Sequence, residues 1–324
     1  MRSPCYEVEG DLQWLTADLL QFVQLPLRAI AMYSPKDLRA IQLLLSDCGQ
    51  QIHTMVAQKF QVYEKGKHDY VTDVDRALDA RLSEAIASLF PSDQIISEEA
   101  PQSFQRFQQP SSRIWAIDPL DGTEDFIQGT PYYSIMLGVL EATRPCAGWV
   151  YAPVGDRLCF GGPNWGLWQA TARQEPQPLL PTPYASEHES TLLMGGQDQR
   201  RFGRAIAEHI PNVQFANIGS FGLKVLEIIQ GRAAMYVYLN RRVKLWDTVG
   251  PLALADAAGL VCCDLAGNPI QFTSTGVDLA TLTHHQPILI GWPHALETLR
   301  SPLQTAISSV LNHETTSKPN SSLP

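Results

Sequence analysis

The chain lacks the features that mark secreted, membrane-spanning or nucleic-acid-binding proteins. Its six cysteines form no C-x-x-C pair, which argues against a zinc site or a disulfide framework. No apolar run approaches the roughly 20 residues that a membrane-spanning helix needs, and the start of the chain lacks the apolar core of a signal peptide. Basic residues are also scarce, with 24 Lys and Arg against 33 Asp and Glu. We therefore expect a cytoplasmic protein with no nucleic-acid partner and no membrane partner.

What is present is the composition of a globular protein. Of the 324 residues, 44% are hydrophobic and 18% are charged, enough for one large domain or two lobes. The net charge of −9 has a chemical consequence. An acidic protein that handles an anionic substrate must supply positive charge locally, and a bound metal cation does so directly.

Hydrophobic periodicity predicts two lobes in which helices alternate with short strands. In the first lobe we expect helices over 36–60 and 72–90, strands over 94–97 and 114–117, and an antiparallel meander over 132–169. The proline-rich segment 173–190 is typical of a linker.

The second lobe repeats the alternation and ends in a terminal helix. Strands are expected over 192–194, 213–216, 234–239 and 287–291, and helices over 198–209, 220–230 and 247–258. The predicted division is a lobe over 1–180, a lobe over 190–312 and a disordered tail over 313–324.

Acidic residues stand at four places where an expected strand or loop meets a helix: Asp75, Glu98-Glu99, Asp118 with Asp121, and Asp247. Each place has an ordinary explanation when it is taken alone. The first and last are good helix-capping positions, and the glutamate pair is typical of a solvated strand end. Their joint occurrence favours a magnesium site, because Mg²⁺ is held by a few carboxylates and keeps several waters.

The six residues from Asp118 to Thr123 combine metal ligands with phosphate donors. A proline-started turn can aim the Asp118 and Asp121 carboxylates and the Leu120 carbonyl at one point. The amides of Gly122 and Thr123 follow at once and can point at an anion. This combination is specific, and the pattern predicts a phosphate ester as the ligand.

With these blocks the sequence resembles the inositol monophosphatase superfamily of lithium-sensitive phosphatases. The blocks occur in the family's order over about residues 40–300, as Asp75, Glu98-Glu99, Asp118-Pro119-Leu120-Asp121-Gly122-Thr123, Trp246-Asp247 and Ala258-Gly259. The resemblance implies an α/β (α+β) fold, a layered αβαβα sandwich like that of inositol monophosphatase and fructose-1,6-bisphosphatase. It also implies lithium inhibition and allows a homodimer.

The resemblance further implies Mg²⁺-dependent hydrolysis of a phosphate monoester by a metal-activated water, with two or three ions. Glu98, Asp118 and the Leu120 carbonyl would hold one ion, and Asp118 would bridge to a second. The remaining ligands of that second ion would be Asp121 and Asp247.

The same resemblance gives the catalytic and phosphate-binding roles. Thr123, oriented by Asp75, would position the attacking water together with the metal held by Glu98. The amides of Gly122 and Thr123 would hold the phosphate oxygens. Glu99 would either support its neighbour or bind a weaker third ion.

The substrate rests on a different set of residues. Asn240 stands where family members that act on inositol phosphates carry Glu, and Ser220 with Lys224 resembles a nucleotide-gripping stretch of the 3′(2′),5′-bisphosphate nucleotidases. Arg241 and its basic neighbours add charge that a second phosphate would require. The ordinary explanations are a solvated helix lysine and a charged loop.

We therefore expect a small phosphorylated metabolite such as 3′-phosphoadenosine 5′-phosphate as the substrate. An inositol or other sugar or polyol monophosphate is the alternative. A non-catalytic metal- or nucleotide-binding regulatory module is the alternative of another class.

Overall fold

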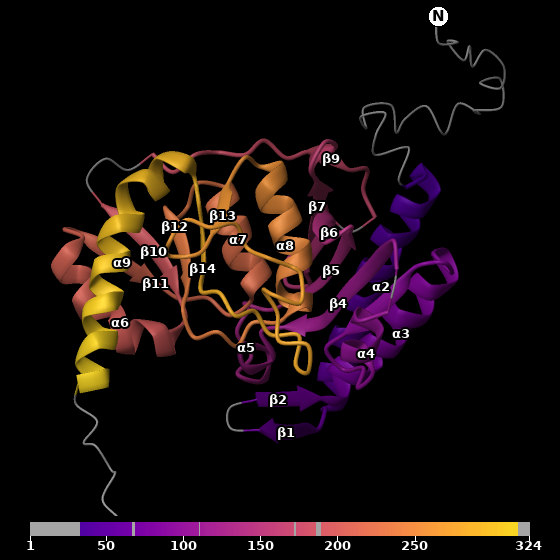
Figure 1. Ribbon diagram of the computed structural model, residues 1–324. Coiled ribbons are helices and arrows are strands. Elements are labelled where there is room, and N and C mark those ends of the chain that lie inside the picture. Colours follow the sequence, from indigo (N-terminus) through magenta and orange to yellow (C-terminus); the bar gives the residue numbers. More distant parts are fainter. Residues whose placement is uncertain (1–32, 67–68, 110, 172, 186–188, 317–324) are drawn as a thin grey trace, which may run out of the picture.

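The computed structural model describes residues 33–66, 69–109, 111–171, 173–185 and 189–316. Figure 1 shows two β-sheets that alternate with three layers of helices, so that the order across the molecule is αβαβα. This is the layered architecture that the family resemblance implies. No helix in the described ranges is long and apolar enough to cross a membrane.

The first sheet has seven strands in the order β3-β4-β5-β6-β7-β8-β9. Only β3 and β4 pair in parallel, and the remaining pairs form the expected antiparallel meander. The last strand lies within the segment predicted as a linker and extends the sheet edge. The strands are β3 (Gln94–Ser97), β4 (Arg113–Asp121), β5 (Ser134–Glu141), β6 (Arg144–Ala152), β7 (Arg157–Gly162), β8 (Gly166–Thr171) and β9 (Gln177–Pro178).

Two helices, α2 (Pro35–Gln58) and α3 (Asp73–Leu89), cover the outer face of this sheet (Figure 1). Each begins at a capping box, with Ser34 before α2 and Thr72 before α3. Their apolar faces join an aromatic core in which the rings of Trp115 and Trp149 stack 5.5 Å apart. A short hairpin of β1 (Val62–Gly66) and β2 (Asp69–Thr72) precedes α3, and β1 is exposed whereas Val71 and Thr72 of β2 are buried.

The second sheet has five strands in the order β11-β10-β12-β14-β13. Its outer face packs on α6 and α9, and Leu192, Phe202 and Leu303 belong to the core between them. The elements are β10 (Ser190–Met194), α6 (Gly196–His209), β11 (Val213–Ala216), β12 (Met235–Tyr238), β13 (Val261–Cys263), β14 (Ile288–Gly291) and α9 (Pro293–Thr316).

The middle layer consists of α7 (Phe221–Ile229) and α8 (Leu245–Ala257), which lie between the two sheets (Figure 1). Three glycines allow α8 to approach the first sheet closely. A Cβ on Gly138 of β5 would lie 2.8 Å from the Gly250 Cα, and one on Gly148 of β6 would lie 2.7 Å from the Gly250 carbonyl carbon. Because these three glycines have no side chains, the backbone of α8 lies directly against β5 and β6. The start of α8 then lies next to β4, the neighbour of β5 in the sheet.

One local prediction about the second lobe differs from the structure, and one of its strands is not predicted. The tail was expected to start at residue 313, but α9 continues to Thr316, because Arg201 of α6 holds Glu314 through two hydrogen bonds of 3.0 and 2.5 Å. The rest of the predicted tail, 317–324, lies outside the described residues. The strand β13 was not predicted, since its three residues carry too little periodicity.

Candidate active site

The parallel pairing of β3 and β4 brings the first acidic groups together. In a parallel pair both carboxyl ends meet at the same edge of the sheet, and Ser97 is paired with Ile117. The backbone N–H of Glu98 continues the pairing by donating to the Ile117 carbonyl at 3.2 Å. The glutamate pair therefore starts beside Asp118.

The turn after Asp118 has the geometry that its sequence suggests. The pairing of β4 with β5 becomes irregular between Asp118 and Asp121, and the Leu120 N–H donates to Asp118 Oδ1 at 3.0 Å. Gly122 has a φ of 95°, which favours glycine, and a Cβ there would lie 2.7 Å from the Tyr132 carbonyl oxygen. The short helix α5 (Thr123–Ile127) begins directly afterwards.

The third carboxylate comes from a segment about 130 positions away along the chain. Asp247 lies in the first turn of α8, where its Oδ2 accepts a hydrogen bond of 2.6 Å from the Lys244 N–H. One oxygen each of Asp118, Asp121 and Asp247 lies within 4.8 Å of the others. Three hard oxygen ligands at this spacing fit a divalent cation such as Mg²⁺.

The crowding of these carboxylates changes their acidity. Burial raises the pKa of Asp118 well above its usual range, and the carboxylates of Glu98, Asp121 and Asp247 raise it further. Burial and neighbouring negative charge also raise the pKa of Glu98 to about 8 and that of Asp247 to about 6. Without a cation the site therefore holds protons near neutral pH, as expected of a cluster built to bind positive charge.

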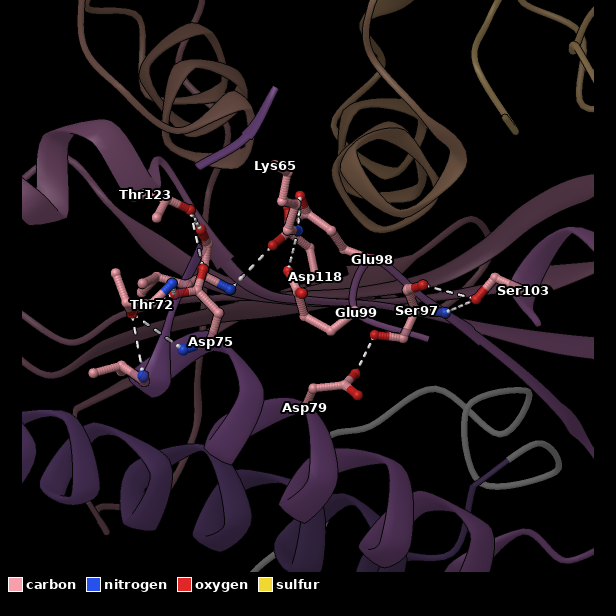
Figure 2. Close-up of polar contacts among 12 residues, drawn as sticks. Lys65, Thr72, Asp75, Asp79, Ser97, Glu98, Glu99, Ser103, Asp118 and Thr123 are labelled. Atoms are coloured by element: carbon pink, nitrogen blue, oxygen red, sulfur yellow. Dashed lines mark hydrogen bonds and ion pairs between the residues drawn. The ribbon is translucent and has the colours of Figure 1, made fainter. Parts of the chain in front are cut away.

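A second group of side chains prepares Thr123. Figure 2 shows Asp75 between Thr72 and Thr123, with all three joined by hydrogen bonds. Asp75 Oδ2 accepts from the Thr72 N–H at 2.8 Å, and its Oδ1 accepts from the Thr123 hydroxyl at 3.1 Å. The same hydroxyl lies 3.0 Å from the Leu120 carbonyl oxygen. Asp75 therefore both caps α3 and orients Thr123.

Sequence reasoning missed the side chains that hold the end of β3. Ser97 donates to Asp79, and the Ser103 hydroxyl donates to the Ser97 carbonyl at 2.7 Å and accepts from the Ser97 N–H at 2.8 Å (Figure 2). Asp79 lies four residues after Asp75 on one face of α3, and this spacing was a usable signal. The network fixes the backbone directly before Glu98.

Of the predicted substrate residues, Ser220 and Lys224 are buried, and neither lines the two clefts that open over the carboxylates. Ser220 caps α7, donates to Asp121 and lies 2.8 Å from the Ser134 hydroxyl. The Lys224 ammonium donates to the Gly219 carbonyl, and burial lowers the pKa of this lysine to about 8. Both residues thus support the Asp121 side of the site from within, and Lys224 is not a solvated helix residue.

Two adjoining clefts open over the carboxylates. The smaller, of about 370 Å³, is lined by Glu98, Asp118, Leu120, Asp121, Gly122, Thr123, Tyr238 and Asp247 among others. Glu98 and Asp247 also line the larger cleft of about 700 Å³. The turn after Asp118, Glu98 and Asp247 therefore meet in one cavity, and the larger cleft beside it offers space for the rest of a substrate.

The larger cleft has a basic and aromatic lining. Arg241, Arg242 and Lys244 line it together with Trp246 and the exposed ring of Phe104. The predicted residue Asn240 does not line either cleft. Its side-chain oxygen accepts a 3.1 Å hydrogen bond from the Arg242 N–H and so shapes the turn that carries the arginines.

Comparison with known proteins agrees with this geometry. A model of the inositol monophosphatase family matches residues 34–296. A fructose-1,6-bisphosphatase/inositol-1-monophosphatase of Aquifex aeolicus (strain VF5) is 34% identical over 217 residues, covering 65% of this chain and 78% of the relative. The 3′(2′),5′-bisphosphate nucleotidase CysQ of Escherichia coli (strain K12) is 28% identical over 218 residues, covering 65% and 83%.

The fold is shared with solved structures. The IMPase of Thermotoga maritima superimposes with a TM-score of 0.67 at 21% identity, over 82% of this chain and 96% of that one. The extragenic suppressor protein SuhB of Bartonella henselae superimposes with a TM-score of 0.66 at 18% identity, over 82% and 97%. The chain belongs to the inositol monophosphatase family and is a phosphatase that hydrolyses phosphate monoesters.

Proposed function

We propose that the protein hydrolyses a phosphorylated nucleotide of the 3′-phosphoadenosine 5′-phosphate type in a Mg²⁺-dependent reaction. The observation that carries the metal dependence is the convergence of Asp118, Asp121 and Asp247 within 4.8 Å of one another. Together with Glu98 and the Leu120 carbonyl, these groups would hold two or three ions. Bound Mg²⁺ supplies the positive charge that activates water and stabilises the leaving oxygen.

The protein's own groups perform the remaining tasks. Asp75 keeps the Thr123 hydroxyl in place, and this hydroxyl orients the attacking water and accepts its hydrogen bond. Gly122 and Thr123 line the same cleft, and their amides would hold the phosphate oxygens as negative charge builds on them. Ser220 and the Gly222 N–H both donate to Asp121, the latter at 3.0 Å, and keep that carboxylate turned toward its partners.

The shape and charge of the larger cleft support a substrate with a second anionic group. Arg241, Arg242 and Lys244 can pair with a second phosphate, while the Phe104 ring offers a face to a planar base. The similarity to CysQ, a 3′(2′),5′-bisphosphate nucleotidase, favours the same class. Inositol or another polyol monophosphate remains the second candidate, favoured by the relative from Aquifex aeolicus.

Catalysis is tested by the Asp118→Asn variant, which keeps the shape of the side chain and removes its charge. We expect the Mg²⁺-dependent release of phosphate from 3′-phosphoadenosine 5′-phosphate to fall by about 100-fold or more. The circular dichroism spectrum should stay that of the wild type. Near wild-type turnover of the variant at saturating Mg²⁺ would show that catalysis does not need Asp118. Wild-type protein that releases no phosphate from any monoester would favour the alternative of a non-catalytic binding module.

The second phosphate is tested by replacing both arginines, Arg241→Gln with Arg242→Gln. Charged hydrogen bonds contribute about 1.5–3 kcal/mol each, so kcat/KM for 3′-phosphoadenosine 5′-phosphate should fall ~10-fold or more. The value for 3′-AMP, which has the same ester and no 5′-phosphate, should stay unchanged. Arg204→Gln on the exposed face of α6 is the matched control.

An equal loss of kcat/KM for both nucleotides would show that the arginines maintain the structure and do not bind a second phosphate. A wild-type kcat/KM that is higher for inositol 1-phosphate than for the bisphosphorylated nucleotide would support the polyol alternative.

A further inference from the structure

His284 is a buried histidine that contacts the start of α8. Its side chain is only 1% exposed, and its Nε2 lies 2.8 Å from the hydroxyl of Thr248, which is fully buried. Burial lowers the pKa of His284 to about 4, so the ring is neutral under physiological conditions. A neutral ring nitrogen either donates to the hydroxyl or accepts from it. Because Thr248 directly follows Asp247, this contact reaches the helical turn that carries the third carboxylate of the site.

The Thr248 hydroxyl connects the ring to the backbone of that turn. It lies 3.2 Å from the Lys244 carbonyl oxygen as well as 2.8 Å from His284 Nε2. When the ring donates, the single proton of the hydroxyl is free to bond the carbonyl. The N–H of Lys244 in turn donates to Asp247 Oδ2 at 2.6 Å. A continuous path of hydrogen bonds thus leads from His284 to the Asp247 carboxylate.

The loop that carries His284 pairs with the residues at the start of α8. The His284 N–H donates to the Val243 carbonyl at 3.0 Å, and the Leu245 N–H donates to the Leu282 carbonyl at 3.0 Å. Leu282 has a φ of 58°, in the left-handed region that leucine rarely adopts. Such a backbone persists only where its surroundings hold it. Since segment 280–283 also lines the larger cleft, the loop joins the lining of that cleft to α8.

We propose that His284 is a positioning residue of the metal site. By holding Thr248 it fixes the first turn of α8 and keeps the Asp247 carboxylate directed toward Asp118 and Asp121. The inference rests on the proposed function, since it assumes that these three carboxylates bind a cation.

Helix ends open more easily than helix interiors, and Asp247 lies near such an end. The close contact of α8 with the first sheet lies at Gly250, after Asp247, whereas His284 acts through Lys244, before it. The two contacts hold Asp247 from both sides along the helix. If the first turn opens part of the time, only the closed fraction presents the full set of ligands, and the apparent affinity for a cation falls with that fraction.

The experiment measures Mg²⁺ binding to the full-length protein by isothermal titration calorimetry. His284→Gln keeps an amide at about the reach of Nε2, and this amide can donate or accept. His284→Asn carries the same amide one carbon shorter, so it does not reach Thr248. The Thr248→Val variant removes the hydroxyl and keeps the shape of the side chain. Ile307→Val, in the buried core beside α6 and α9, is the matched control for a loss of stability without contact to α8.

We expect His284→Asn and Thr248→Val each to weaken Mg²⁺ binding about 5-fold, as the loss of one hydrogen bond does. His284→Gln should bind Mg²⁺ as the wild type does. The double variant His284→Asn with Thr248→Val should bind no more weakly than the weaker single variant, because both changes remove the same contact. The control Ile307→Val should lower the Tm and leave the affinity for Mg²⁺ unchanged.

A histidine that only fills the core would behave differently. Wild-type affinity in His284→Asn or in Thr248→Val would overturn the inference, and so would equal losses in the Gln and Asn variants of His284. Losses that add in the double variant would also contradict it. Thr248→Val leaves His284 in place, so the test does not depend on how the His284 variants fold.

Failure of the proposed function gives a separate result. In that case the wild-type protein binds no Mg²⁺, or Asp118→Asn binds it as tightly as the wild type, whatever residue stands at position 284.

Discussion

Single residues of the site close a helix and contact other site residues at the same time. Asp75 caps α3 through Oδ2 and holds Thr123 through Oδ1. Asp247 accepts a hydrogen bond from the Lys244 N–H at the start of α8, and one of its oxygens still lies within 4.8 Å of Asp118 and Asp121. A carboxylate has two oxygens and several lone pairs, so one oxygen can close a helix while the other faces a ligand. Helix capping and metal ligation are thus compatible explanations of the same residue.

The raised pKa values predict how the metal-free protein responds to pH. Glu98 has a pKa of about 8 and Asp247 of about 6, both above the ordinary values of 4.5 and 3.8, chiefly because of burial. The folded state therefore binds these protons more tightly than the unfolded state. Their contribution to stability is complete below the ordinary pKa values and is lost as the pH rises through about 6 and then about 8. We expect the Tm without metal to fall as the pH rises from the ordinary pKa values to about 8, and we expect Mg²⁺ to restore it.

Asp118→Asn isolates this effect from other titrating groups. The amide is a neutral side chain of the same shape, so it removes a charge that repels its neighbours. Without metal and at about pH 8, the variant should have a higher Tm than the wild type, while Mg²⁺ should raise its Tm less. Thermal unfolding with and without Mg²⁺ measures both quantities. A metal-free wild type that is more stable than Asp118→Asn at this pH would contradict the crowding of charge at the site.

At the level of elements, the glycine contact between α8 and the first sheet decides where Asp247 lies. A Cβ on Gly250 would lie 3.1 Å from the Leu137 carbonyl carbon and would meet backbone that cannot rotate away. Asp247 is one turn before this contact on the same helix. Any outward shift of α8 therefore moves its carboxylate away from Asp118 and Asp121.

Gly250→Ala tests this dependence. Overpacking costs about 1–3 kcal/mol or more in free energy of unfolding, and the apparent Mg²⁺ affinity should fall with it. The matched control is Gly203→Ala in α6, where a Cβ would meet side-chain carbon atoms at 3.4 and 3.8 Å. There alanine should be neutral or stabilising by about 0.5–1 kcal/mol. Denaturant unfolding and metal titration of both variants give the comparison, and equal effects in the two would contradict the role of close packing.

The elements also show what could be read from the sequence. The step of Val74, Leu78, Leu82 and Ile86 predicts α3, and all four are buried. The short hairpin β1–β2 has exposed residues in β1 and carried no such pattern, so this hairpin was not predictable. Likewise, the motif alone indicates a substrate role for Ser220 and Lys224, and only the packing of α7 shows that both side chains are buried and that Ser220 donates to Asp121.

On the scale of the whole molecule, the site forms where three layers meet. The carboxyl ends of β3 and β4 supply Glu98 and Asp118, α3 supplies Asp75, and the middle layer supplies Asp247. The order of the acidic motifs along the chain was visible in the sequence, whereas their distances depend on how α8 crosses the first sheet. The larger cleft, with its basic and aromatic lining, likewise appears only when segments 100–104, 241–246 and 280–283 are brought together.

The most direct test is isothermal titration calorimetry of Mg²⁺ binding to the wild type and to Asp247→Asn, with Asp256→Asn on the exposed face of the same helix as the control. If carboxylates from both segments hold one cation, Asp247→Asn should weaken binding by ~10-fold or more, or remove one ion, while the control binds as the wild type does. Equal affinity and equal stoichiometry in Asp247→Asn and the wild type would contradict a metal site shared between β4 and α8.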